Sequence, residues 1–359
     1  MKKFKIMIAT GFLVASYLPT IAQDKGLTFG AYLETYYNYD FSNPDNHQRP
    51  GFIYSHNRHN EFSLNLGLLK ASYQDETLRG NFSLMTGSYA DANLVAEPTV
   101  LKHIFEANVG VKLSKTSDLW LDVGVLPSHI GFESAIGILN PTLTRSISAE
   151  NSPYFETGAK LTWKSDDAKW LLSGLILNGW QRIQRVEGNN TPAFGHQVTF
   201  TPNDRISLNS SSFVGNDFPD SLRRMRYFHN LYGIFKLSEK LSLTTGFDIG
   251  FQQKIKGSND YDTWYTPTVI LALSPSEKVT VALRAEYYAD KNGVIINSQT
   301  ANGFKTFGFS ANVDLKINKL ATWRLEARNL TSKDPIFTHE NGGANDSNFV
   351  VATSLAISF

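Results

Sequence analysis

The sequence predicts an all-β chain that closes into a transmembrane, antiparallel up-and-down β-barrel of about 16 strands, preceded by a cleaved signal peptide. Three observations favour this fold. Apolar and polar residues alternate with a period of two, long and short connections alternate along the chain, and aromatic residues reach 13%. In hydrocarbon every backbone N–H and C=O must be paired internally, so a spanning sheet has to close on itself with apolar side chains outside.

Residues 1–22 are typical of a secretory signal peptide. Three lysines within the first five residues precede an apolar stretch at 6–18, and small residues ending at Ala22 form a cleavage site. The apolar stretch is shorter than the roughly 20 residues that a spanning helix needs. We therefore expect export of a single domain, residues 23–359, and a retained membrane anchor is the alternative.

The composition excludes several classes of protein. Without cysteine, a disulfide framework, a cysteine-ligated metal or redox site and a lipid anchor on cysteine are impossible. Loss of three signal-peptide lysines changes the formal net charge from +1 to −2, which gives no reason to expect a nucleic-acid partner. After the signal, uncharged stretches such as 263–276, which contains two prolines, are too short for membrane helices.

Alternation is clearest in residues 241–252, where Leu243, Phe247 and Phe251 fall on one face and Asp248 falls on the other. Other segments are less regular, and the pattern does not assign the faces of 169–180 and 205–214. Sixteen candidate strands follow in order: 27–40, 60–72, 77–89, 103–113, 119–126, 155–164, 169–181, 193–201, 205–215, 224–236, 241–252, 263–273, 278–289, 303–315, 321–330 and 348–359.

The connections between these segments alternate between short turns and long loops. This order is typical of membrane barrels, which have tight periplasmic turns and longer external loops, and an even strand number places both termini on the periplasmic side. Aromatic residues near strand ends, such as Trp180, Tyr227, Trp264 and Tyr265, indicate girdles at the membrane boundaries. A soluble β-sandwich or propeller with core aromatics is the alternative, but no motif recurs every 40–50 residues.

A set of short motifs lies between residues 122 and 163. Together they resemble the OmpL-like family of outer-membrane β-barrel porins, and the resemblance implies pore formation without indicating a solute. Phe359, at the end of an alternating strand, resembles the signal recognised by the outer-membrane assembly machinery. The motifs are Gly124, Gly131-Phe132-Glu133, Arg145-Ser146, Ser152-Pro153-Tyr154 and Thr157-Gly158.

The longest connection, 127–154, contains six large apolar residues, which an external loop in water rarely carries. We therefore expect it to fold into the barrel mouth and narrow the pore. Glu133, Arg145 and Glu150 are then candidate charges facing a permeating solute. A cap packed outside the mouth and an oligomer contact are the alternatives.

Charged residues within the strands are predicted to face inward, because Arg or Lys at the bilayer midplane costs about 2–4 kcal/mol. Such residues either set ion selectivity or form a salt-bridge lattice that fills the lumen. Both signs occur, so strong selectivity is not predicted. The candidate pore-lining residues in strands are Lys112, Glu156, Lys160, Arg284, Glu286, Arg324, Glu326 and Arg328.

No cofactor, metal site or catalytic residue is predicted. His56 and His59 lie in a loop without a carboxylate cluster, and the acidic stretch 259–262 lacks the ligand spacing of a calcium loop. Ser128 and His129 are adjacent, and neighbours on a strand point to opposite faces. The sequence contains neither a Gly-x-Ser-x-Gly elbow nor a phosphate-binding loop.

The expected function is that of a porin, which gives small hydrophilic solutes passive passage across the outer membrane of a Gram-negative bacterium. Its expected partners are outer-membrane lipid, the assembly machinery, the solutes and, in a homo-oligomer, further copies of the chain. The alternative is a non-conducting barrel that serves as an adhesin, anchor or assembly partner through its long loops.

Overall fold

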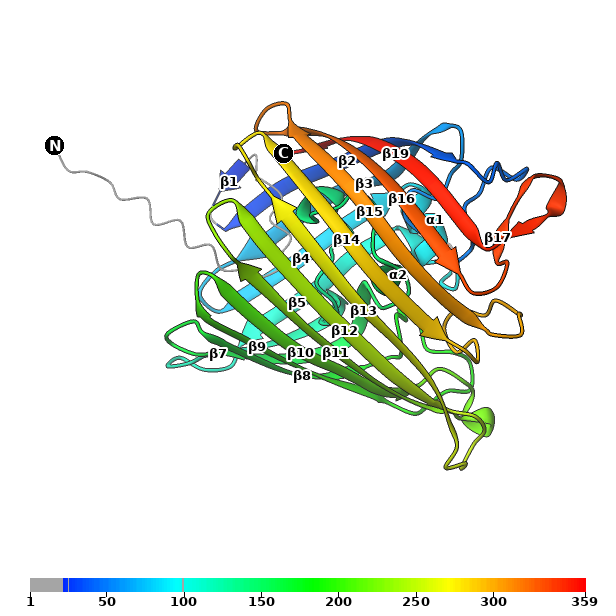
Figure 1. Cartoon of the computed structure of the whole chain (residues 1–359). Coiled ribbons are helices and arrows are strands. Elements are labelled where there is room, and N and C mark those ends of the chain that lie inside the picture. The colour runs from blue at the N-terminus through cyan, green and yellow to red at the C-terminus, as the bar shows by residue number, and fades with distance from the viewer. Residues whose placement is uncertain (1–21, 25, 99) are drawn as a thin grey trace.

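A computed structural model describes residues 22–24, 26–98 and 100–359, and within these ranges 16 antiparallel strands form one closed barrel (Figure 1). The predicted signal peptide lies outside the described residues except for Ala22. This residue begins a short strand, β1 (Ala22–Asp24), which pairs with the start of the first barrel strand. In the part of the chain that is described, no helix has both the length and the apolar character to cross a membrane.

Each barrel strand pairs with the next one along the chain. Their bounds are β2 (Leu27–Asp40), β3 (Phe62–Gln74), β4 (Leu78–Thr86), β5 (Ile104–Lys112), β6 (Asp118–Pro127), β7 (Phe155–Lys164), β8 (Trp170–Leu177), β9 (Ala193–Asn203), β10 (Ile206–Asn216), β11 (Met225–Lys236), β12 (Leu241–Gln253), β13 (Tyr261–Leu273), β14 (Val279–Asp290), β15 (Phe304–Lys316), β16 (Ala321–Ser332) and β19 (Ser347–Ser358).

The barrel closes where its last strand, β19, pairs with its first, β2. The terminal residue, Phe359, takes part in this seam. Its backbone N–H donates to the carbonyl of Ala31 at 3.0 Å, and its carbonyl accepts from the Ala31 N–H at 2.8 Å. Closure satisfies the backbone of both edge strands, as a sheet in hydrocarbon requires.

All 16 predicted strands are present, and the alternation of long and short connections is confirmed. Two predicted strands run too far. The strand predicted over 77–89 ends at Thr86, because Gly87 adopts φ 120° and the short helix α1 (Ser88–Asn93) follows. The strand predicted over 169–181 ends at Leu177.

The predicted alternation of faces is also confirmed. In β12, Phe247 and Phe251 are exposed on the outer face, whereas Asp248 and Gln252 are buried inside. The two segments whose faces the sequence left unassigned, β8 and β10, turn apolar side chains inward as well. Leu175, Leu177 and Phe213 join an apolar cluster inside the barrel. In β8 both faces are therefore largely apolar, whereas in β10 Ser210 and Ser212 face outward and Phe213 faces inward, so the period-two signal disappears in both strands.

The aromatic girdle is only partly as predicted. Tyr227 and Tyr265 lie on the outer face, each about two-fifths exposed. Trp180 and Trp264, by contrast, belong to the interior apolar cluster, where their rings pack against Phe228. Since Trp264 and Tyr265 are neighbours on one strand, they must point to opposite faces, and only one of them can meet lipid.

Candidate functional site

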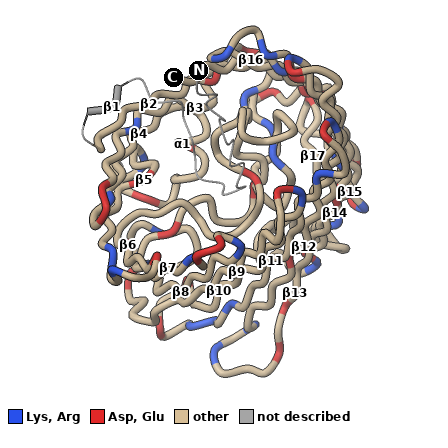
Figure 2. The backbone as a smooth tube through the Cα atoms, turned by 90° about the vertical axis from the view of Figure 1, so that its left-hand side faces the viewer, with Lys and Arg blue, Asp and Glu red and all other residues tan. Residues whose placement is uncertain are grey.

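The loop that joins β6 to β7, residues 128–154, lies inside the barrel. Its backbone bonds to inward side chains from distant parts of the wall. The Gly131 N–H donates to Asn230 of β11 at 3.2 Å, and the Gly137 carbonyl accepts from Arg324 of β16 at 2.7 Å. Figure 2 shows chain segments lying within the ring of strands, and Figure 1 places helix α2 (Ile147–Glu150) there. The prediction that this loop folds into the barrel is therefore confirmed.

The loop has its own polar frame. The Arg145 guanidinium donates to the carbonyls of Leu143 at 2.7 Å and Ala135 at 2.8 Å, which holds two turns of the loop together. The Ser146 side chain accepts from the Ala149 N–H and so caps α2. The loop's apolar residues are largely covered, as predicted, although Leu139 stays 40% exposed. The buried ones include Ile130, Ile136, Leu143 and Ile147.

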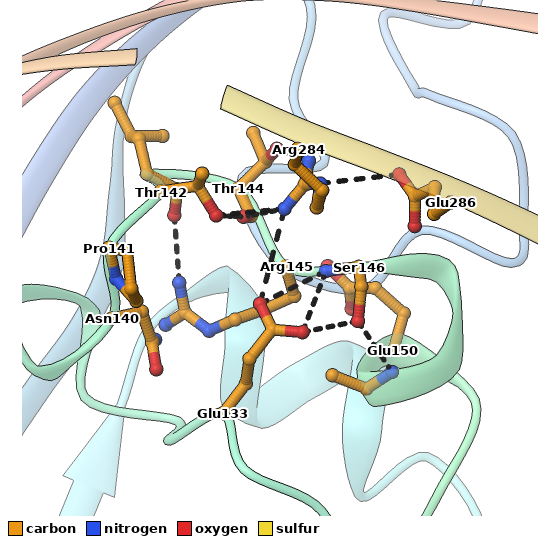
Figure 3. Close-up of polar contacts among 12 residues, drawn as sticks. Glu133, Asn140, Pro141, Thr142, Thr144, Arg145, Ser146, Glu150, Arg284 and Glu286 are labelled. Carbon is orange, nitrogen blue, oxygen red and sulfur yellow. Dashed lines mark hydrogen bonds and ion pairs between the residues drawn. The ribbon is translucent and has the colours of Figure 1, made fainter. Parts of the chain in front are cut away.

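Two strands on one side of the barrel, β14 and β16, anchor this frame, and Figure 3 shows the contacts of Arg284 on β14. Arg284 of β14 donates to the Thr144 carbonyl at 2.6 Å and to the Thr142 hydroxyl at 2.9 Å. Glu326 of β16 accepts from the Thr144 N–H at 2.5 Å and pairs with Arg284 at 3.0 Å. Glu286, also on β14, accepts from the N–H of Ile147 at 2.6 Å. The wall charges thus satisfy the backbone of a loop that lies away from bulk water.

A second anchor lies beside the first. Arg324 donates to the carbonyls of Gly137 and Asn140, at 2.7 and 2.8 Å, and pairs with Asp314 at 2.8 Å. Glycine suits position 137, because a Cβ there would lie 2.5 Å from Oε1 of the buried Glu34 carboxylate, which would have to move. The loop backbone therefore approaches the wall more closely than a side chain would allow.

A second loop, residues 41–61, covers the first. Glu150 accepts from the backbone N–H groups of Tyr54 and Ser55, each at 3.1 Å. Asn151 donates to the carbonyl of Phe52 at 3.1 Å. Sequence reasoning missed this contact, and the signal that could have indicated it is the adjacent apolar pair at 52–53, which is buried in the interior cluster.

The electrostatics of the inserted loop follow from its burial. Burial raises the pKa of the Glu133 carboxyl, and the Arg284 guanidinium, 3.9 Å away, opposes this shift. Burial likewise raises the pKa of Glu150 against the opposing charge of Arg145. The two carboxyls also accept backbone and hydroxyl hydrogen bonds, so they act as acceptors that hold loop segments in place.

The predicted pore-lining residues divide into two sets. As predicted, the charged strand residues all point inward. However, nine of the eleven candidates are 8% exposed or less. Glu133, Arg145 and Glu150 were expected to face a solute, and instead they bond to loop backbone. Of the two interpretations left open for the wall charges, the lattice describes Arg284, Glu286, Arg324, Glu326 and Arg328. Glu156 lies outside this lattice, because both oxygens of its buried carboxyl lack a hydrogen-bond partner among the described residues.

Lys112 and Lys160 form the other set, half-buried on the inner wall of β5 and β7. They belong to a charged region that extends over β3 to β7. The register places Arg79, Gly110, Asp122 and Lys160 in one row across four strands. Arg79 pairs with Asp122, and Lys70 pairs with Glu106 at 2.5 Å. Among the described residues, Lys112 and Lys160 have no ion-pair partner, so cations outnumber acids here.

The histidines have structural partners. His56 lies 3.4 Å from Glu34, and the ring of His59 accepts from the Asp40 N–H at 2.9 Å. Within the described ranges, no three His, Cys, Asp or Glu side chains are grouped as a metal ion would need.

The sequence profile of the family described as "Putative beta-barrel porin-2, OmpL-like" matches residues 26–359. No curated protein sequence matches this chain. Solved structures with a similar fold include an anion-selective porin from Comamonas acidovorans, with 10% identity, a TM-score of 0.61 and coverage of 93% of this chain and 99% of that one. OmpF of Salmonella typhi, in complex with daunomycin, is 10% identical with a TM-score of 0.60, and the match covers 94% of this chain and 99% of that one. The trimer form of Vibrio cholerae OmpT is 8% identical with a TM-score of 0.56, and the match covers 93% of this chain and 99% of that one. At such identities the likeness shows the fold.

Proposed function

Because this chain belongs to the OmpL-like β-barrel porin family, we propose that it gives small hydrophilic solutes passive passage across the bacterial outer membrane. The observation that carries this proposal is the difference between the two faces of the barrel. The outer face is apolar, and the inner wall of β3 to β7 keeps charged side chains that are not fully covered. Water and solutes meet such a wall, whereas lipid would exclude it.

The inserted loop, 128–154, is the proposed constriction. Its support is the set of bonds to separate parts of the wall, on β11 and on β16, which hold the loop inside the lumen. Solutes would pass between the loop and the charged wall of β3 to β7. Lys112 and Lys160, which lack ion-pair partners in the described chain, would give this passage a weak preference for anions.

Conductance in planar lipid bilayers tests both statements. We expect the refolded protein to form channels whose reversal potential, in a potassium chloride gradient, indicates a modest preference for chloride. In the double variant Lys112→Gln and Lys160→Gln, we expect the ratio of chloride to potassium permeability to fall about two- to fivefold, because two unpaired positive charges leave the passage. Lys291→Gln, in an external loop, is the matched control. An unchanged ratio in the double variant would contradict the role of the two lysines.

The second candidate function is a non-conducting barrel that acts through its external loops. One observation favours it, namely that nine of the eleven predicted lumen charges are buried. Swelling of liposomes distinguishes the candidates. A porin admits small sugars and the liposomes swell, whereas a plugged barrel leaves them unchanged. Absence of both swelling and conductance would overturn the porin proposal.

Three further parts of the proposal concern the context of the barrel. Export by the signal at 1–22 would deliver the chain to the outer membrane. Phe359, which ends the closing strand, would be the residue that the assembly machinery binds. The barrel would act without catalysis, and copies of it would associate in the membrane.

A further inference from the structure

The lipid-facing surface of β9, β10 and β11 carries a group of four uncharged polar side chains within its apolar belt. His196, Ser210, Ser212 and His229 form this group, which we call the polar patch. By strand parity all four point outward, since the inward positions alternate with them. Apolar outward residues continue above and below the patch on the same strands, namely Phe194, Val198, Leu208, Val214, Tyr227 and Leu231.

The patch is one connected cluster. The register places His196, Ser212 and His229 side by side across the three strands. The Ser212 hydroxyl bonds to Nδ1 of His196 at 2.5 Å, the Ser210 hydroxyl bonds to Nε2 of His229 at 3.3 Å, and the two imidazole centroids are 5.8 Å apart. Nε2 of His196 and Nδ1 of His229 find no hydrogen-bond partner among the residues that the structure describes. Each histidine thus presents one unsatisfied nitrogen on the outer surface.

Lipid is a poor environment for this cluster, because acyl chains cannot satisfy the remaining nitrogens and hydroxyls. Polar groups on the hydrocarbon-facing surface of a membrane protein are expected to bond across to another protein. Nearly every other polar residue of these three strands points inward. The exposure of the cluster therefore indicates a surface that is covered in the membrane.

A recess lies next to the patch. Gly174 of β8 pairs directly with His196, and a Cβ at this glycine would meet nothing within 4 Å. Beside it is an outer-surface hollow of about 320 Å³, lined mainly by apolar side chains that include Leu161, Trp163, Leu172 and Val198. The two features together give a hollow that accepts a protruding side chain and a polar rim that offers hydrogen bonds.

We infer that this face, β8 to β11, is where a second copy of the chain packs in the membrane. The patch holds no formal charge in its neutral form, so two copies meet without repulsion. Imidazole and hydroxyl groups both donate and accept hydrogen bonds, so the patch is complementary to itself. A lipid phosphate would call for lysine or arginine, and the patch contains neither. This inference rests on the association of copies in the proposed function and names the face that makes it; because each barrel encloses its own lumen, the face can be wrong while the porin proposal stands.

Site-specific cross-linking in membranes tests the contact. Because the sequence contains no native cysteine, an introduced cysteine is the only thiol that can react. A Ser212→Cys variant is treated with a short bis-maleimide. The matched control is Ala311→Cys, which is exposed on the apolar outer face of β15. We expect a band of twice the protomer mass for the first variant and none for the second. A Ser212→Cys variant that stays monomeric, or that cross-links to a protein of different mass, would overturn the inference.

A second measurement avoids introduced thiols. In mild detergent, native mass spectrometry of the wild-type chain should show an oligomer. In the double variant His196→Leu and His229→Leu, the oligomer fraction should fall at least tenfold. Thr35→Leu, a polar-to-apolar change at an outward position of β2, should keep the oligomer. Folding of each variant is checked by heat-dependent gel mobility and by single-channel conductance. An oligomer that persists in the double variant, or a monomeric wild type, would contradict the proposed face.

Discussion

Arg284 is the side chain on which docking of the inserted loop most depends, and its replacement by methionine gives a quantitative test. The guanidinium is fully buried, makes three hydrogen bonds to Thr142 and Thr144, and pairs with Glu326. Hydrogen bonds to charged groups contribute about 1.5–3 kcal/mol each. Removing one partner of a buried ion pair costs about 3–5 kcal/mol, because the other charge stays buried. Shared partners make these terms overlap, so we expect a loss of about 3–5 kcal/mol.

A loss of this size shifts the docking equilibrium of the loop by two to three orders of magnitude, since about 1.4 kcal/mol corresponds to a factor of ten. Arg284→Met should therefore lower the free energy of unfolding in urea and raise single-channel conductance as the loop leaves the lumen. Arg205→Met is the control, because that side chain is 63% exposed and lies 3.9 Å from Glu239. Exposed pairs contribute about 0–1 kcal/mol. If Arg284→Met matched this control in both measurements, the anchoring role would be refuted.

Two further predictions concern the inserted loop. Gly137→Ala should lower the free energy of unfolding by about 1–3 kcal/mol, because the new Cβ would meet the buried Glu34 carboxylate; Gly51→Ala, at a site with open space, separates this clash from a general effect of replacing glycine. Burial lowers the pKa of the His129 imidazole to about 4, so the folded state resists protonation and the barrel should lose stability as pH falls from about 6.5 towards 4. Urea titrations at several pH values check this slope, and a His129→Gln variant that kept the full slope would assign it to other groups.

The strands and their faces could be predicted from sequence because lipid and water impose opposite demands on alternate side chains. Arg324, Glu326 and Arg328 face inward for this reason alone. The pattern fails in β8, where Leu175 makes the inner face apolar, and in β10, where Phe213 faces inward while two serines face outward. There the chemistry of the two faces no longer differs, and period two carries no information.

Contacts between loops could not be predicted in the same way. Glu150 and the N–H groups of Tyr54 and Ser55 lie almost 100 residues apart in sequence. No local pattern encodes such a pairing, because it depends on two loops entering the same space. The sequence could place Glu133, Arg145 and Glu150 in the lumen through the apolar content of their loop. Whether they faced water or backbone depended on the second loop.

The seam between β19 and β2 has a consequence for biogenesis. β2 pairs with β3 along one edge, and its other edge is paired only when β19 joins it, where Phe359 completes the ladder opposite Ala31. Before that moment every partial sheet has two bare edges that hydrocarbon will not tolerate and that other chains would readily extend. Closure therefore requires β19, and a chain that lacks this strand would leave the edge of β2 unpaired.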